Sequence, residues 1–151
     1  MAFDSLECSE YSRPPAFESG AGGLVSTIDD YYAFCRMLLN KGVWGGARLL
    51  SEASIEAMTR DQLMPEQRKG AQIFFGSHSS WGFGMAVNIH RENPWNVPGR
   101  FGWDGGFGTS AYSDPAHDFI GILLTQRLLD SPEPPAVFKD FWTQAYRSLD
   151  A

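Results

Sequence analysis

The chain has 151 residues, of which 43% are hydrophobic and 20% charged, and its formal net charge is −6. That length suits one compact domain, and the composition is too apolar for a disordered chain. The acidic balance, without any cluster of basic residues, argues against binding to nucleic acid or to an anionic membrane surface.

Residues 1–23 show no periodicity and are expected to form an extended arm that ends in a glycine-rich turn. A helix is predicted next. Thr27 is suited to cap its N-terminus, and Asp29 and Asp30 would lie in the first turn, where the helix dipole favours acidic groups. Apolar residues then recur at helical spacing: Ile28, Tyr31, Cys35, Leu38 and Leu39. Cys35 is therefore expected to be a small buried side chain.

Ser51 is suited to cap a second helix, in which Ile55 and Met58 share one face. Residues 64–80 are polar and are expected to form a mobile loop. Between residues 81 and 89 apolar side chains alternate with small or polar ones, which predicts a strand with one nearly bare face.

The second half of the chain contains two more predicted strands and a final helix. A glycine-rich segment, residues 99–108, leads into a strand at 109–113, and Asp114-Pro115 predicts a turn. Residues 119–125 are almost continuously apolar, which is typical of a central strand. The last helix has the strongest helical pattern, with apolar or small residues on one face: Phe138, Phe141, Trp142, Ala145, Tyr146 and Leu149.

This order of elements predicts the α+β class. We expect an antiparallel sheet of about three strands, covered on one face by the C-terminal helix and preceded by two helices. Residues 24–151 would form this single domain, and residues 1–23 would form the arm.

Three blocks of sequence stand in a fixed order along the chain. They are Ser19–Tyr31, Trp81-Gly-Phe-Gly-Met85 and Phe101–Ser110, and they are accompanied by shorter matches at Arg48–Ser51 and Leu123–Arg127. In order and separation, they resemble the C-terminal portion of serine β-lactamase-like hydrolases. That superfamily contains β-lactamases, penicillin-binding proteins and esterases.

The resemblance implies a fold and a chemistry. In this superfamily an α/β domain with an antiparallel sheet packs against a mostly helical domain, and the active site lies between them. The family's Lys-Thr-Gly triplet on the sheet matches Trp103-Asp104-Gly105 here. The implied activity is acyl transfer on an ester, amide or β-lactam, and tryptophan in place of the lysine favours the ester.

Acyl transfer builds negative charge on a carbonyl oxygen, which backbone N–H groups held in place stabilise. By motif position the Gly106 N–H is the expected donor, and Gly105 keeps the backbone beside it bare. Trp103, Asp104, Gly105 and Phe107 are expected to bind substrate, Trp103 as an apolar wall with an indole N–H. The alternative is that these glycines only permit a tight bend and that Trp103 is a core residue.

The attacking groups of the family are missing from this sequence. No serine is followed by a lysine three residues later, so there is no Ser-x-x-Lys motif, and there is no Gly-x-Ser-x-Gly elbow. Tyr146-Arg-Ser148 fits the family's Tyr-x-Ser pattern only formally, because it lies far beyond the expected place. A triad of His117 and Asp118 with either Ser110 or Ser113 is disfavoured. We therefore expect a fragment that is inactive alone.

The sequence predicts neither a metal nor a cofactor. Cys8 and Cys35 form no Cys-x-x-Cys pair, and the three histidines lack ligand spacing. The chain has neither a signal-peptide pattern nor a run of about 20 apolar residues, the length of a membrane span. The localisation of the parent protein stays open, with the cytoplasm favoured.

The expected partner is a small ester, amide or β-lactam substrate of the full-length protein, in which the nucleophile segment would precede residue 1. The alternative is a non-catalytic binding or assembly module. A half-fold without the family's first elements is expected to expose a sheet edge and apolar helix faces. Through that edge the chain would form a homo-oligomer or exchange strands.

Overall fold

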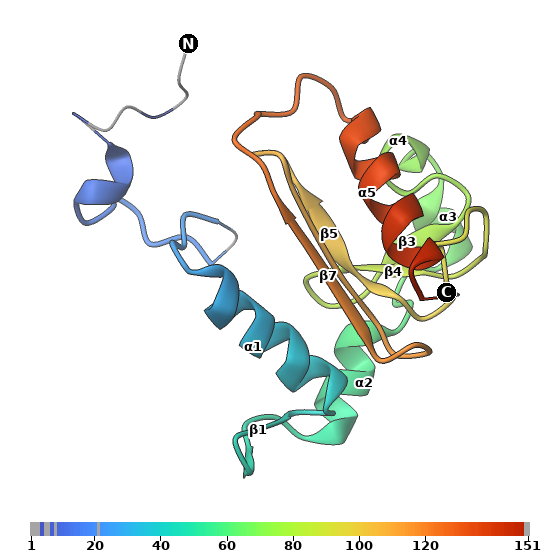
Figure 1. Ribbon diagram of the computed structural model, residues 1–151. Helices are drawn as coiled ribbons and strands as arrows, with labels where there is room; N and C mark the ends of the chain where they lie inside the picture. The colour runs from blue at the N-terminus through green and yellow to red at the C-terminus, as the bar shows by residue number, and fades with distance from the viewer. Residues whose placement is uncertain (1–3, 5–6, 8, 21, 150–151) are drawn as a thin grey trace.

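A computed structural model describes residues 4, 7, 9–20 and 22–149. It is built around a five-stranded antiparallel sheet with the order β3-β4-β5-β6-β7 (Figure 1). The strands of this sheet are Ser79–Trp81 (β3), Ala86–Asn88 (β4), Phe101–Gly105 (β5), Thr109–Asp114 (β6) and Phe119–Leu124 (β7). A separate two-stranded ribbon pairs Val43–Trp44 (β1) with Ala47–Arg48 (β2).

The helices lie before and after this sheet in the sequence, which confirms the predicted α+β class. They are Ile28–Leu39 (α1), Glu52–Thr59 (α2), Pro65–Arg68 (α3), Gln72–Phe75 (α4) and Ala136–Arg147 (α5), with a 3₁₀ turn at Glu10–Ser12 in the arm. Within the described residues, none of these helices has both the length and the apolar character that a membrane crossing requires.

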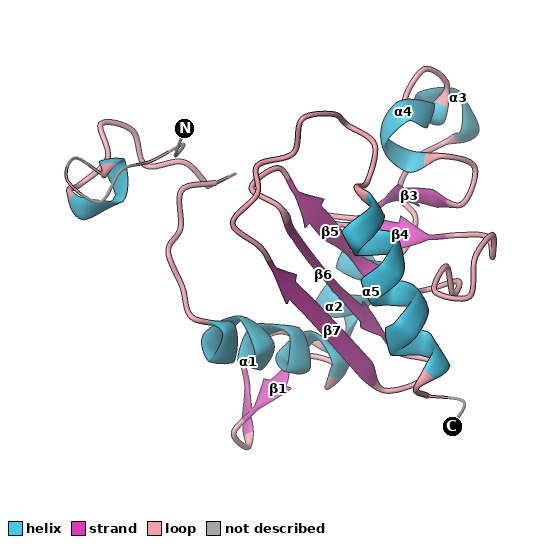
Figure 2. Cartoon of the chain, turned by 45° about the horizontal axis from the view of Figure 1, so that its top comes forward, coloured by secondary structure: helices cyan, strands magenta, loops and turns pink. Residues whose placement is uncertain are grey.

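Helix α1 begins where the sequence predicts. The Thr27 hydroxyl accepts a hydrogen bond from the Asp30 N–H at 3.1 Å. Cys35 is buried as expected, whereas Cys8 lies outside the described residues. Ile28 and Tyr31 belong to the predicted apolar face but are exposed, because the first turns of α1 extend past the sheet (Figure 2).

One face of the sheet is covered by α1 and α2. Their apolar side chains pack against the inner strands in a cluster made of Met37, Leu38, Ile55, Met85, Val87 and Phe101. Ser51 caps α2 as predicted, and Met58 packs against the cluster beside the buried Ile55.

The opposite face is covered by α5 (Figure 2). Phe138, Trp142 and Tyr146 are its buried side chains, in agreement with the predicted helical face. The approach is close, because a Cβ added at Gly121 in β7 would lie 2.4 Å from the Trp142 ring. Helices therefore cover both faces of the sheet, where the sequence led us to expect one. Alternate residues of β6 and β7 supply packing surface to both layers.

The sheet has five strands instead of about three, because residues 79–88 fold back on themselves. The sequence predicts one strand between 81 and 89, but Gly84 adopts a φ of +88° and the chain turns there. Trp81 consequently pairs with Ala86 across a β3–β4 hairpin. The expected loop at 64–80 contains the short helices α3 and α4 and the first residues of β3.

The apolar strand at 119–124 lies at an edge of the sheet rather than in its centre. Within the described part of the chain, β7 pairs only with β6. Its apolar character reflects the helices packed on its two faces, not neighbouring strands on both sides.

Candidate functional site

The expected site residues lie at the end of β5 and in the turn that leads to β6. Gly108 closes this turn: its N–H donates to the Gly105 carbonyl at 3.0 Å, and its φ of +80° suits a glycine. The Leu129 N–H donates to the Gly106 carbonyl at 2.8 Å. The segment after β7 therefore anchors the tip of the hairpin, which fixes the position of the Gly106 peptide.

The outer half of β5 has a neighbouring strand on one side only. Strand β4 pairs with Phe101 and Gly102, so within the described residues Trp103–Gly105 pair with β6 alone. The Gly106 N–H follows this half and has no hydrogen-bond partner in the described part of the chain. A Cβ at Gly106 would meet nothing within 4 Å, so the peptide is open to a ligand. An unpaired N–H in an open position can bind a carbonyl oxygen.

An aromatic surface lies next to this edge. Trp103 is 40% exposed, which excludes the alternative that it is a core residue. Its ring meets Trp81 edge to face, with the ring centroids 4.7 Å apart. A small apolar pocket of about 400 Å³ is lined by Leu63, Phe74, Phe75, Trp81 and Trp103. Phe107 is exposed at the hairpin tip. The edge therefore adjoins a surface suited to an apolar substituent.

Asp104 points toward α5. Its carboxylate accepts a hydrogen bond from the Ser110 hydroxyl at 2.5 Å, and the Ser110 oxygen accepts one from the Trp142 indole at 2.9 Å. Burial raises the pKa of Asp104, although the Ser110 hydrogen bond and the charge of Arg100 oppose the shift. The side chain thus links β5 to β6 and to the underside of α5.

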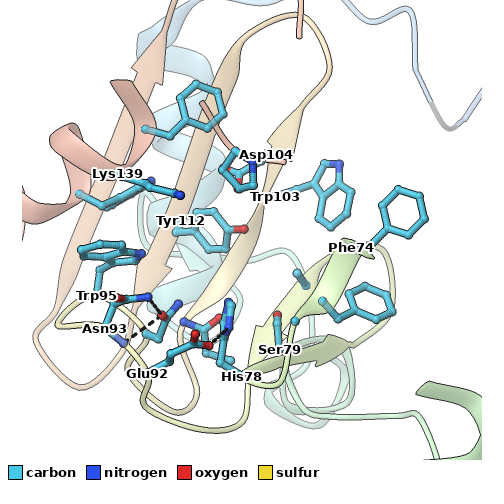
Figure 3. A pocket seen from close by; sticks show the side chains of 18 of the residues that line it. Phe74, His78, Ser79, Glu92, Asn93, Trp95, Trp103, Asp104, Tyr112 and Lys139 are labelled. Carbon is cyan, nitrogen blue, oxygen red and sulfur yellow. Dashed lines mark hydrogen bonds and ion pairs between the residues drawn. The ribbon is translucent and has the colours of Figure 1, made fainter. Parts of the chain in front are cut away.

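A second, larger cavity of about 530 Å³ lies between α5, strands β4–β6 and the segments 72–79 and 92–96 (Figure 3). Arg100 and Asn88 line it, and they are only 2% and 3% exposed. Nε and Nη2 of Arg100 and Nδ2 of Asn88 have no hydrogen-bond partner among the residues that the structure describes. The Arg100 guanidinium stacks on Tyr112 and Trp142, at 3.8 and 4.1 Å from the ring centroids.

Sequence reasoning missed this second cavity. Its only signal in the sequence is a charged residue, Arg100, between Gly99 and Phe101 in a segment of glycine and aromatic residues. That signal does not reveal burial, which depends on the docking of α5.

The structure gives other roles to the remaining candidate groups. Ser110 is 1% exposed and bonded on both sides, so its hydroxyl is closed to a substrate. The His117 ring lies 2.7 Å from Asp114, and Asp118 pairs with Arg36. These residues therefore do not form a triad with Ser110. Within the described residues, no three potential ligands gather into a metal site.

Comparison with known proteins yields one family and a small set of relatives. The Beta-lactamase family model matches residues 4–139. Two Mycobacterium tuberculosis proteins, Rv1367c of strain H37Rv and the uncharacterized protein MT1414 of strain CDC 1551, are each 37% identical over 128 residues. The matches cover 78% of this chain and 31% of each relative, so the chain spans less than a third of their length.

A solved structure also resembles this fold. It is that of a novel penicillin-binding protein homolog from Caulobacter crescentus, with a TM-score of 0.53 and 21% sequence identity. The match covers 75% of this chain and 30% of that one. At this level of identity the likeness concerns the fold alone.

Proposed function

The chain belongs to the beta-lactamase family, and from that premise we propose that it forms the sheet side of a serine acyl-transfer site. The substrate would be an ester, amide or β-lactam, and Trp103 at the position of the family's lysine favours an ester. The observation that carries this proposal is the Gly106 N–H, which is open, has no partner among the described residues and lies beside the half of β5 that β4 does not pair with.

In this proposal the residues of the chain bind and orient the substrate. The Gly106 N–H donates to the carbonyl oxygen as negative charge develops on it. An apolar substituent of the substrate lies against Trp103 and the adjoining pocket. The attacking hydroxyl comes from outside this chain, because the sequence has no Ser-x-x-Lys and the Ser110 hydroxyl is enclosed.

Replacement of Gly106 in the natural full-length protein tests the role of its N–H. Gly106→Pro removes the donor and should lower kcat for a chromogenic ester about 10²–10³-fold, the usual effect of losing one oxyanion donor. Gly106→Ala keeps the N–H, and neither space nor φ opposes the added methyl group, so this variant should stay within a few-fold of wild type.

The purified 151-residue chain provides the matching control. With a chromogenic ester and a chromogenic cephalosporin, it should give no turnover above that of its Ser110→Ala variant. The proposal is wrong if the full-length Gly106→Pro protein keeps its kcat, or if the chain alone shows catalytic turnover that is intrinsic to it.

A second candidate function is a non-catalytic assembly module. The free edge of β7 and the exposed first turns of α1 favour it, because unpaired strand edges and apolar patches are common sites of association. In this alternative a second copy of the chain would add a strand beside β7.

A further inference from the structure

Two residues that line the larger cavity carry three buried donor atoms for which the described part of the chain provides no acceptor. These atoms are Nε and Nη2 of Arg100 and Nδ2 of Asn88. Buried polar groups are nearly always hydrogen-bonded, and each unsatisfied one costs about 1–3 kcal/mol. We propose that this cavity is a binding site for a small carboxylate with an apolar or aromatic body. Trp103, Asp104 and Gly106 also line it, so the site adjoins the edge of the proposed acyl-transfer site.

The chemistry of the unsatisfied atoms identifies the kind of group that they need. All three are N–H donors, so the missing partner is an acceptor. Arg100 carries a full positive charge, and within the described residues no carboxylate lies within the 4.0 Å of an ion pair with it. A carboxylate supplies two acceptor oxygens and the opposite charge, and it suits the planar fork of a guanidinium.

The acidic side chains that line the cavity do not take this role. Asp104 lines it and its charge interacts with that of Arg100 at a longer range than an ion pair, but its carboxylate accepts a hydrogen bond from Ser110. Glu92 also lines it and lies 2.6 Å from the His78 ring (Figure 3). Lys139 of α5 adds a second positive charge at the cavity wall.

The rest of the lining fixes the character of the ligand body. Phe74, Trp95, Trp103 and Phe138 supply large apolar surfaces, and a volume of about 530 Å³ lies within the usual range of small-molecule sites. Stacking on Tyr112 and Trp142 holds the Arg100 guanidinium in one orientation, which lowers the entropy lost on binding. An aromatic or short aliphatic acid meets both requirements.

Calorimetric titration of the purified chain with matched acid and amide pairs tests the site. Benzoate and hexanoate should bind saturably. Benzamide and hexanamide have nearly the same shape without the charge, and their affinity should be lower by a factor of about ten or more. Equal affinity for acid and amide, or no saturable binding of either acid, overturns the proposal. The measurement needs neither a catalytic nucleophile nor turnover, so a failure of these acids to bind can be distinguished from a failure of the proposed acyl transfer.

Variants then place the binding in this cavity. Arg100→Gln should abolish benzoate binding, provided that its circular dichroism spectrum is that of wild type. Because this buried substitution can unfold the chain, two exposed lining residues give a second test. Lys139→Ala and Ile73→Ala, which change residues of the larger cavity alone, should each weaken benzoate binding several-fold, about 3–10-fold. Lys69→Ala and Leu49→Ala, which lie outside the lining, should not. Unchanged binding in both lining variants contradicts the assignment.

Discussion

Asp104 shows how one residue of a motif can serve the fold. The sequence places it in the triplet that lines the family's active site, between Trp103 and Gly105. In the structure its carboxylate bonds Ser110 and lies under α5, while Trp103 remains exposed. Neighbouring residues of a strand point to opposite faces, so one motif contributes to two different surfaces.

The raised pKa of Asp104 gives a prediction about pH. The folded chain binds this proton more tightly than the unfolded chain, whose Asp has a pKa of about 3.8. The contribution of Asp104 to stability is therefore complete below pH 3.8 and is lost as the pH rises through the folded-state pKa. Asp104→Asn does not titrate, so its free energy of unfolding should increase relative to wild type as the pH rises from about 4. Urea denaturation across that range measures this difference.

Asp118 supplies a control of opposite sign. Its hydrogen bond with Arg36 lowers the pKa of Asp118, so the stability that it contributes is present above its unfolded pKa and is lost as the pH falls through the folded value. Asp118→Asn should therefore approach wild-type stability as the solution is acidified. For Asp104, a difference in the free energy of unfolding between wild type and Asp104→Asn that stays constant over the whole pH range would falsify the assignment of its raised pKa to burial.

At the scale of elements, Trp142 is one of three buried side chains that attach α5 to the sheet. Its ring packs over Gly121, its indole N–H bonds Ser110, and its face stacks on Arg100. The helix thus combines apolar burial with a buried hydrogen bond. The close packing of α5 against β7 requires that residue 121 has no side chain.

Two substitutions should reveal this contact from opposite sides. Trp142→Ala should lower the free energy of unfolding by about 3–5 kcal/mol, because it leaves a large cavity. Gly121→Ala should lower it by about 1–3 kcal/mol, because the added methyl group overlaps the ring. Val137→Ala, at an exposed position of the same helix, should change it by less than about 0.5 kcal/mol. Chemical denaturation compares the three, and a near-wild-type Trp142→Ala would mean that α5 is not docked.

Some elements could be predicted from local sequence, whereas others could not. The caps at Thr27 and Ser51 and the buried face of α5 were predictable, because they depend on hydrogen bonds and periodicity within one helix. The β3–β4 hairpin was not. Its alternating pattern fits one long strand equally well, and only pairing with β5 and the turn at Gly84 distinguishes the two.

At the scale of the whole molecule, the described sheet has unequal edges. On the β3 side the strands are short, and on the β7 side six residues have no further neighbour within the described residues. Leu124, at the end of β7, is 55% exposed. Long apolar edges without protection tend to pair with other chains.

Concentration-dependent association is the expected result of this edge. Sedimentation velocity over a wide concentration range should show dimers or larger species. Leu124→Lys should shift the chain toward the monomer, since edge lysines oppose strand pairing. Leu49→Lys, the same substitution at an exposed site outside the sheet, is the matched control. A folded monomer at all concentrations would count against the assembly module.

The candidate site was predictable only where its residues are close together in the sequence. The glycines after β5 and the exposed tryptophan could be identified in the sequence, because the family motif is contiguous there. Arg100, Asn88 and Tyr112 could not be grouped as one cavity, because they come from three places in the sheet and meet only beneath α5. Sites of that kind depend on tertiary packing.

The half-paired strand β5 has a consequence for mutational tolerance. Phe101 is buried in the core and Asp104 bonds under α5, whereas Trp103, Gly106 and Phe107 are exposed. Trp103 still packs edge to face on Trp81, but substitutions at these exposed positions should cost less stability than substitution of Phe101. The tip of the strand can therefore tolerate variation while its buried half supports the fold.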